Sequence, residues 1–272
     1  MMKWYDFVPA KFEMVKLSKH REFAFLKPVQ IRALNLYKID HFQKYFQVAN
    51  FEKKQPNLYL SVATLNNIPI FTYHPKTRSE LTSVWFKNNY FDEVTGYDLF
   101  MDFDKEEDES WEDLIKEIKE FKGYLDDYKV PYYLVFSGNK GFQLTIRYEF
   151  LPDGLTFEVD ENGKGKEKSV YEFTKRFQEK AKEVFDLKHL DLANNGVPNR
   201  LRKLPYSLVK DNVVLPLSDA EFNLWRVENM DYNQVMRIVR IKDRGLLERS
   251  YSLTEKELKG QFLMFIREFG LK

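Results

Sequence analysis

The segment YDLFMDFD, residues 97–104, is the most informative part of the sequence for predicting the fold. Its aspartates are interspersed with apolar and aromatic residues and alternate with Phe103 at its end, which is typical of a β-strand. Side chains two positions apart on a strand point to the same face, roughly 6.5 to 7 Å apart at the backbone. Asp102 and Asp104 can therefore direct two carboxylates at one or two hard divalent ions. Such a pair is also common on a solvated surface, and Asp98, at the start of the strand, is expected to be a turn residue.

The residues after this strand predict one helix and two further strands. Ser110 and Asp113 resemble a capping box, and apolar residues then recur every three or four positions as far as Tyr128. Pro131 follows the end of this amphipathic helix. The stretches YYLVF and FQLTIRY, residues 132–136 and 142–148, predict two strands joined by a tight SGNKG turn. The predicted order is strand, helix, strand, strand.

The second half of the chain predicts a turn-rich loop followed by helices. Residues 152–168 contain the turn-forming pairs DG and NG, and we expect a mobile hairpin loop there. Capping patterns predict three helices after it, beginning at Ser169 and ending near Phe185, covering residues 232–242 behind Asp231, and running from Thr254 to Gly270. We expect residues 189–217 to form strands and loops. The domain boundary is expected near residue 225, between a core of residues 1–225 and a helical appendix of residues 226–272.

Length and composition exclude several classes of protein. A chain of 272 residues with 43% hydrophobic and 31% charged residues can bury a large core, which excludes disorder, collagen and coiled coil for the whole chain. No segment approaches the roughly 18 uninterrupted apolar residues of a membrane span, and the start lacks a signal-peptide pattern. We therefore expect a cytoplasmic protein without a membrane partner. Because cysteine is absent, disulfides, thiol catalysis and cysteine-based zinc sites are excluded, and oxygen ligands must hold any metal.

The net charge of +1 hides two oppositely charged regions. Residues 1–91 carry 14 basic and 6 acidic side chains, whereas residues 92–127 carry 4 basic and 15 acidic ones. A solvated helix face accounts for much of this acidic region. An acidic centre flanked by basic segments also suits divalent metals that act on a polyanion, and charge alone does not choose between these interpretations.

Two further segments could contact phosphates. The turn SGNKGFQ, residues 137–143, could cradle a phosphate with its backbone amides and Lys140, although a tight hairpin explains the glycines equally well. No helix beginning with Lys-Ser or Lys-Thr follows, so this turn is not a P-loop. The run NRLRKLPYSL, residues 199–208, places three cations before a turn, and Asp191 could add a third carboxylate.

Together, these motifs resemble those of the archaeo-eukaryotic primase superfamily, which contains primase catalytic subunits and primase-polymerases. Its first motif is a pair of metal-binding aspartates, which Asp102 and Asp104 match. Its second, SGxxGxH, corresponds to residues 137–143. Its third is an aspartate followed twelve positions later by Arg or Lys before x-P-x-S, which Asp191, Lys203 and the PYS segment after it reproduce. The stretch HREFAF at residues 20–25 and the later pair Ile31-Arg32 resemble an N-terminal segment of the replicative members.

The resemblance implies an α/β (α+β) catalytic core with an RRM-like βαββ palm that carries the metal carboxylates, plus a small C-terminal helical region. It implies a DNA primase or DNA-directed polymerase that transfers a nucleotide from an NTP or dNTP to a 3′-hydroxyl and releases pyrophosphate. The cofactor would be Mg²⁺ or Mn²⁺ in a two-metal site, without zinc. The implied partners are single-stranded template and primer, with a helicase, a large-subunit-like protein or CRISPR adaptation proteins as accessories.

The resemblance also assigns roles to individual residues. The catalytic metal ligands are Asp102, Asp104 and Asp191. The nucleotide-binding residues are Ser137, Gly138, Lys140, Gly141, Gln143, Lys203 and Ser207. Contacts with the template or the initiating nucleotide fall to Arg32, Arg200 and Arg202.

The sequence departs from the family pattern at two positions and leaves two other functions open. Gln143 stands where the family usually has histidine, so a hydrogen-bond donor replaces a possible cation, and Val209 replaces another frequent histidine. With only one helix between the first two motifs and no zinc insertion, the chain fits a mobile-element or CRISPR-associated branch better than a replicative subunit. A two-metal nuclease and a non-catalytic single-strand-binding adaptor remain the alternatives. They differ from a polymerase in needing no nucleoside triphosphate.

Overall fold

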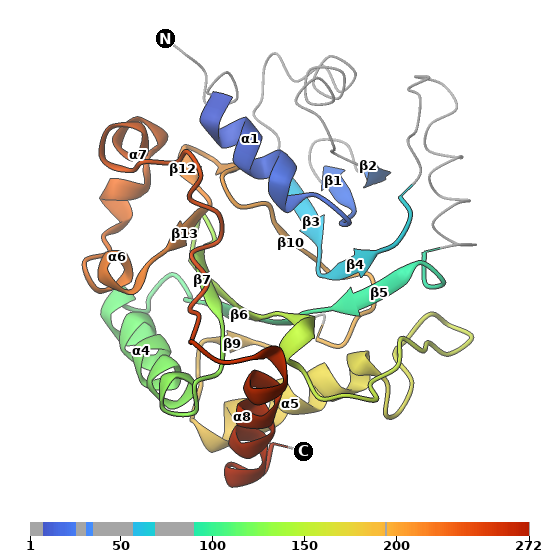
Figure 1. Ribbon diagram of the computed structural model, residues 1–272. Helices are drawn as coiled ribbons and strands as arrows, with labels where there is room; N and C mark the ends of the chain where they lie inside the picture. Colours follow the sequence, from blue (N-terminus) through green and yellow to red (C-terminus); the bar gives the residue numbers. More distant parts are fainter. Residues whose placement is uncertain (1–7, 26–30, 35–56, 69–89, 194, 272) are drawn as a thin grey trace. The chain divides into compact units, whose positions relative to one another are not determined.

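A computed structural model describes residues 8–25, 31–34, 57–68, 90–193 and 195–271 (Figure 1). The chain forms two compact units, and each is composed of several segments. The first unit comprises Met1–Thr95, Val135–Asn139 and Leu201–Leu247. The second comprises Gly96–Leu134, Lys140–Arg200 and Glu248–Lys272. The boundary predicted near residue 225 stays a prediction.

An antiparallel sheet of four strands, in the order β10-β3-β1-β2, forms part of the first unit. Its strands are β1 (Phe23–Phe25), β2 (Ile31–Leu34), β3 (Leu58–Ser61) and β10 (Leu201–Lys203), and helix α1 (Val8–Leu17) precedes them. Strand β3 pairs with β1 through Leu60 and Phe23, and with β10 through Leu60 and Arg202. The sheet therefore joins the N-terminal segment to the NRLRKLPYSL segment, which the sequence did not predict.

The rest of the first unit consists of short elements. They are β4 (Ala63–Leu65), the hairpin of β11 (Leu208–Val209) and β12 (Asn212–Val213), β13 (Leu215–Leu217), α6 (Asp219–Asn223), η3 (Val227–Met230) and α7 (Tyr232–Ile238). Asp231 caps α7 as predicted, by accepting a hydrogen bond from the Asn233 amide at 2.9 Å. The prediction of a helix through residue 242 was wrong, because Val239 already has extended backbone angles.

The second unit contains the predicted strand, helix, strand, strand order. Its elements begin with β6 (Leu99–Asp104), α4 (Trp111–Asp127), β7 (Tyr133–Phe136), which ends in the first unit, and β8 (Gly141–Ile146), and continue with η2 (Tyr148–Phe150), α5 (Val170–Val184), β9 (Leu190–Asp191) and α8 (Glu255–Glu268). Strand β6 pairs antiparallel with β8 and with β9. The single strand predicted for residues 97–104 is divided into β5 (Val94–Tyr97) and β6, because Asp98 lies between them and accepts a hydrogen bond from the Tyr148 amide at 3.2 Å.

The helix starts follow the capping predictions. The Asp113 amide donates to Ser110 Oγ at 3.0 Å, and the Glu172 amide donates to Ser169 Oγ at 3.3 Å. Thr254 forms a full capping box at the start of α8. Each of these bonds satisfies an amide that has no partner within its helix, which is why the starts could be located from sequence. In the predicted hairpin loop, Val159 and Gly165 form an isolated antiparallel bridge.

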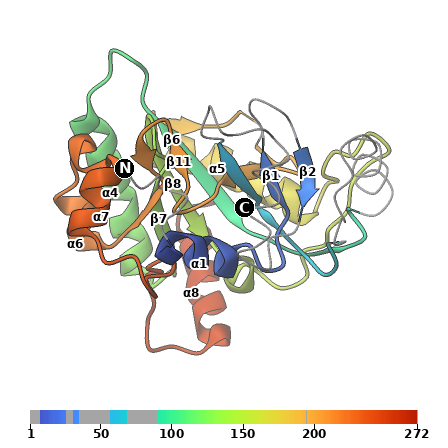
Figure 2. The same ribbon diagram turned by 90° about the horizontal axis from the view of Figure 1, so that it is seen from above.

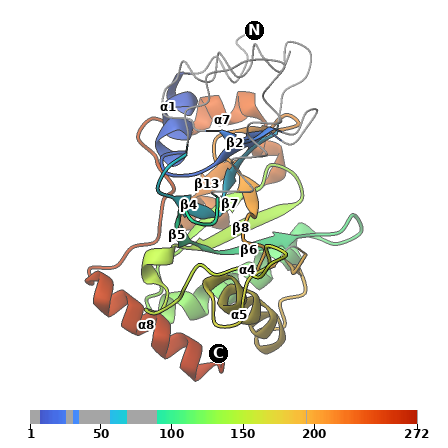
Figure 3. The ribbon, with the colours of Figure 1, turned by 90° about the vertical axis from the view of Figure 1, so that its right-hand side faces the viewer.

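Helices α4, α5 and α8 share an aromatic core in the second unit, where α5 and α8 lie side by side (Figures 1 and 3). Phe185 links the three helices, because its ring centroid lies 5.4 Å from that of Phe121 and 6.0 Å from that of Phe265. Phe177 adds a contact of 5.8 Å to Phe262. Each such pair contributes about 0.5 to 1.5 kcal/mol beyond its buried area, so α8 belongs to the core of this unit. Among the described helices, none combines the length and apolar composition needed to cross a bilayer.

Candidate functional site

The strand register of the second unit places four predicted site residues on one face. Asp102 of β6 lies directly opposite Gln143 of β8 and Asp191 of β9. Residues that face each other across antiparallel strands project to the same side, and Asp104, two positions along, projects there too. The side chains of Asp102, Asp104 and Asp191 are all partly exposed. The structure thus brings the three predicted carboxylates onto one surface.

The opposite face of the same strands is apolar and packs against α4. Phe103 alternates with the two aspartates of β6 and lies opposite Phe142. Its ring is 6.3 Å from Phe121, and Phe142 makes an edge contact of 6.0 Å with Trp111. Because α4 covers this face, Phe103 is separated from Asp102 and Asp104, as the alternation at the end of the segment predicts.

The turn that precedes β8 brings a cation to the carboxylate of Asp104. Lys140 Nζ lies 3.1 Å from Asp104 Oδ2, and this hydrogen bond raises the pKa of the Lys140 ammonium. The Lys105 amide also donates to the Lys140 carbonyl at 3.0 Å. A Cβ atom on Gly141 would lie 1.8 Å from the Phe103 carbonyl oxygen and 2.7 Å from Asp104 Oδ1. Gly141 is therefore required for β8 to approach β6 beside this carboxylate.

Asp191 lies at the end of β9, which has only two residues. The Asp104 amide donates to the His189 carbonyl at 2.9 Å, so β6 supports the residues just before Asp191. Asp191 Oδ1 accepts the Ala193 amide at 2.7 Å. As the side chains stand, no three acidic or histidine side chains among the described residues are grouped closely enough to hold a metal ion. The donor set itself fits a hard ion, because three carboxylates on one face supply the oxygen ligands that Mg²⁺ and Mn²⁺ prefer.

Arg200 lies on the carboxylate side of β6. Its guanidinium carbon is 4.8 Å from the centroid of Phe100, which shares the face of Asp102 two positions along the strand. The loop before Arg200 is anchored by Tyr97, whose hydroxyl donates to the Val197 carbonyl at 2.8 Å. Burial raises the pKa of Tyr97 and keeps its hydroxyl protonated as the donor.

Two predicted serines in the first unit are buried with free hydrogen-bonding capacity. In the part of the chain that the structure describes, neither Ser137 Oγ nor Ser207 Oγ has a hydrogen-bond partner, and the two residues are 2% and 0% exposed. Such hydroxyls are rare because each costs free energy to bury. Gly138, which follows Ser137, has a φ of +82°, and a Cβ atom there would lie 2.9 Å from Val209 Cβ. Val209, at the position of the expected histidine, thus packs against Gly138.

The residue before Ser207 has an unusual backbone. Tyr206 has a φ of +67°, a conformation that bulky residues rarely adopt. Its hydroxyl donates to the Gly245 carbonyl, and its amide donates to the Val214 carbonyl at 2.6 Å. These bonds stabilise the backbone that presents Ser207. The sequence pattern contained no signal for this role of Tyr206.

Among the remaining predicted cations, the structure describes the side chains of Arg202 and Lys203 but only the backbone of Arg32. Arg202 and Lys203 are neighbours on β10, so their side chains point to opposite faces of the sheet, and Arg202 is buried. Arg32 lies on β2, and its side chain is outside the described residues. The structure therefore groups Asp102, Asp104, Lys140, Gly141, Gln143, Asp191 and Arg200 in the second unit. It places Arg32, Ser137, Gly138, Arg202, Lys203 and Ser207 in the first.

The fold is similar to that of a polymerase domain. The polymerase domain of Mycobacterium tuberculosis ligase D, solved in complex with DNA, matches with a TM-score of 0.50 and 13% sequence identity, over 89% of each chain. The predicted mixed α+β fold is thereby confirmed. No protein-family model matches the sequence, and no curated protein matches it.

Proposed function

We propose that this protein is a template-dependent nucleotidyltransferase, a DNA primase or polymerase of the primase-polymerase type. The observation that carries the proposal is the register of β6, which sets Asp102 opposite both Asp191 and Gln143, with Asp104 on the same face. The likeness to a polymerase domain over most of the chain supports it. The narrower assignment to a mobile-element or CRISPR-associated branch rests on the sequence motifs.

In this proposal, Asp102, Asp104 and Asp191 hold two Mg²⁺ or Mn²⁺ ions. When bound, such ions lower the pKa of an attacking 3′-hydroxyl and neutralise the charge that develops on the leaving pyrophosphate. The protein contributes placement, because three carboxylates on paired strands are held in position by backbone hydrogen bonds. Lys140 now pairs with Asp104, and it would transfer to a phosphate oxygen when metal and nucleotide bind.

The proposed nucleotide contacts rest on the sequence motifs and on the chemistry of the side chains. Lys140 supplies a cation, and the Gln143 amide supplies a neutral donor on the carboxylate face. The unpartnered hydroxyls of Ser137 and Ser207 can each donate one hydrogen bond to an anionic phosphate oxygen. Lys203 adds a second cation, and Gly138 and Gly141 are assigned to nucleotide binding by the sequence motif, in which backbone amides beside glycines can contact phosphate.

Arginines would contact the nucleic acid. Arg200 is the best supported, because it lies on the carboxylate side of β6 over Phe100. Arg32 and Arg202 are assigned to the template or initiating nucleotide by the sequence motifs. DNA is the proposed polymer, since the similar polymerase domain was solved in complex with DNA. Accessory helicase, large-subunit-like or CRISPR adaptation partners belong to the same proposal.

The deciding experiment measures primer extension and de novo dinucleotide synthesis with labelled nucleotides and Mg²⁺ or Mn²⁺. The double variant Asp102→Ala with Asp104→Ala is expected to lose both activities while its circular dichroism spectrum stays unchanged. Full activity of this variant would overturn the metal assignment. Degradation of labelled DNA in the absence of nucleotides would instead indicate a nuclease, and metal-independent DNA binding alone would indicate an adaptor.

A further inference from the structure

The carboxylate of Glu117 is the main polar support of the segment that carries Asp191. This side chain projects from α4 and is only 11% exposed, in a helix whose other acidic residues mostly face solvent. It accepts the Lys188 amide at 2.9 Å and the His189 amide at 3.1 Å. It also accepts a hydrogen bond from His189 Nδ1 at 2.8 Å, which requires the proton to be on Nδ1 because a carboxylate can only accept.

The segment that Glu117 holds has little backbone support of its own. Strand β9 consists of Leu190 and Asp191 and pairs with β6 over two positions, whereas β6 and β8 pair over six. The carbonyls of Lys188 and Leu190 accept hydrogen bonds from Lys182 of α5. The amides of residues 188 and 189 both point to Glu117. A short strand with so few ladder bonds depends on side chains for its position.

His189, whose ring and amide contact Glu117, also contacts Glu109 and the backbone of Asp104. Its ring is buried, and its Nε2 lies 3.6 Å from Glu109 Oε2. Glu109 belongs to the acidic loop between β6 and α4, which Figure 2 shows projecting away from both elements. The His189 carbonyl accepts the Asp104 amide. One residue therefore links Glu117 to the backbone of Asp104 and precedes Asp191 by two positions.

We infer that Glu117 is a positioning residue that sets the place of Asp191 relative to Asp102 and Asp104. The inference rests on the proposed function, since it requires Asp191 to be a metal ligand. It goes beyond the sequence motifs, in which Glu117 has no role. Hydrogen bonds that orient metal ligands typically change metal affinity by about 10- to 100-fold when they are removed.

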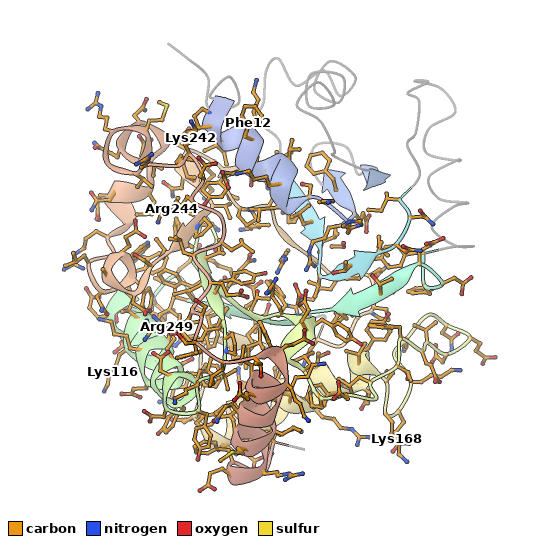
Figure 4. The ribbon with its side chains drawn as sticks, in the orientation of Figure 1. Phe12, Lys116, Lys168, Lys242, Arg244 and Arg249 are labelled. Carbon is orange, nitrogen blue, oxygen red and sulfur yellow. The ribbon has the colours of Figure 1, made fainter. Side chains whose placement is uncertain are left out.

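The main test substitution is Glu117→Gln, which keeps the size of the side chain. Gln has one acceptor oxygen, and its NH₂ group would oppose one of the three donors that now meet the carboxylate. Glu120→Gln is the matched control, because Glu120 is 64% exposed on the same helix and pairs only loosely, at 3.9 Å, with Lys116. Figure 4 shows Lys116 on the outer side of α4.

Two measurements do not depend on turnover. Hydrogen exchange followed by NMR or mass spectrometry is expected to show amides 188 and 189 exchanging about tenfold faster in Glu117→Gln than in the wild type. Titration with Mn²⁺ alone is expected to show roughly tenfold weaker binding. Glu120→Gln should match the wild type in both. In primer extension, the activity lost by Glu117→Gln should return at high Mn²⁺ concentration, which a merely destabilised fold would not explain.

The outcomes separate this inference from the proposed function. If Asp191→Asn weakens Mn²⁺ binding but Glu117→Gln does not, the inference is wrong and the metal site stands. The inference would also be overturned if amides 188 and 189 exchanged in the wild type as fast as unprotected amides. This measurement needs no variant, so it applies even if Glu117→Gln fails to fold. If Asp191→Asn binds Mn²⁺ as the wild type does, the proposed function is overturned together with the inference.

Discussion

The two compact units present their motif residues in contrasting ways. In the second unit, Asp102 and Asp104 lie on a strand that pairs over six positions with β8, are partly exposed, and have Lys140 beside them. In the first unit, Ser137 and Ser207 lie outside strands, are fully buried, and have no hydrogen-bond partner among the described residues. A regular strand ladder can hold carboxylates in position because partial exposure to water limits the free energy that their charge costs. Neutral donors can be kept unpaired and buried at a smaller cost in stability.

The largest expected effect tests the carboxylate side of this contrast. Asp102→Asn removes one negative charge from the face of β6 and should lower kcat of nucleotide incorporation by about 10³-fold, because metal ions supply several kcal/mol of charge stabilisation. Steady-state primer extension measures it. Asp108→Asn, an exposed change in the same acidic region, should leave kcat unchanged. Equal losses of kcat in both variants would show that activity depends on the net charge of the acidic region and not on the position of Asp102 on β6.

A second prediction concerns the close approach of β8 to β6. Gly141→Ala places a Cβ atom against the Phe103 carbonyl and should lower the free energy of unfolding by about 1 to 3 kcal/mol, with loss of activity. Gly123→Ala in α4 has open space around it and should instead raise the free energy of unfolding by about 1 kcal/mol. Urea denaturation measures both. A tolerated alanine at 141 would contradict the described spacing beside Asp104.

The serines of the first unit provide a third prediction. Ser137→Ala and Ser207→Ala should each raise the nucleotide KM roughly tenfold, because a hydrogen bond to a charged phosphate is lost. Neither should lower the free energy of unfolding, since the removed hydroxyl has no partner to lose. Ser169→Ala is the opposite case, because it removes the cap of α5 and should cost about 1 kcal/mol without changing KM. A loss of stability at 137 and 207 would show that these hydroxyls have a structural role.

A fourth prediction concerns Lys140, whose removal should change metal affinity and nucleotide affinity in opposite directions. Lys140→Ala removes a partly exposed cation from Asp104 and should strengthen Mn²⁺ binding in the absence of nucleotide by up to about fivefold. The same change should weaken nucleotide binding, so the two affinities move in opposite directions. Calorimetric titrations measure both. Lys105→Ala is the control, because it removes a positive charge from the position after Asp104. If Lys105→Ala increases the Mn²⁺ affinity equally, the effect of Lys140→Ala comes from net charge and not from the ion pair with Asp104.

The smallest expected effect compares one carboxyl group from each unit. The hydrogen bond from Lys16 lowers the pKa of Asp243, so its stabilisation is present above pH 3.8 and is lost as the pH falls through the folded pKa. Burial raises the pKa of Glu248, against the opposing effect of Arg147, so stability increases as the pH falls through its folded pKa toward 4.5. Asp243→Asn should therefore reduce the loss of stability in acid, and Glu248→Gln should increase it. Urea denaturation at several pH values measures both, and changes of the same sign would contradict these shifts.

Much of the second unit could be predicted from sequence because its signals are local. Ser110, Ser169 and Thr254 mark helix starts by hydrogen bonds that span three residues. The alternation in β6 indicates which side chains share a face, since a strand repeats every two residues. The four-stranded sheet of the first unit gave no comparable signal, because its strands are short and far apart in the sequence.

The amino-acid sequence alone was enough to identify the candidate carboxylates, hydroxyls and cations, and to predict which carboxylates lie two positions apart on a strand. The folded chain was needed to show that Asp191 lies opposite Asp102 and that Glu117 is buried against the segment before Asp191. It also revealed the unusual backbone of Tyr206 beside Ser207. The difference arises because these interactions act over different separations along the sequence. Capping and alternation act over a few residues, whereas strand register and the burial of a charge depend on partners that only the folded chain brings together.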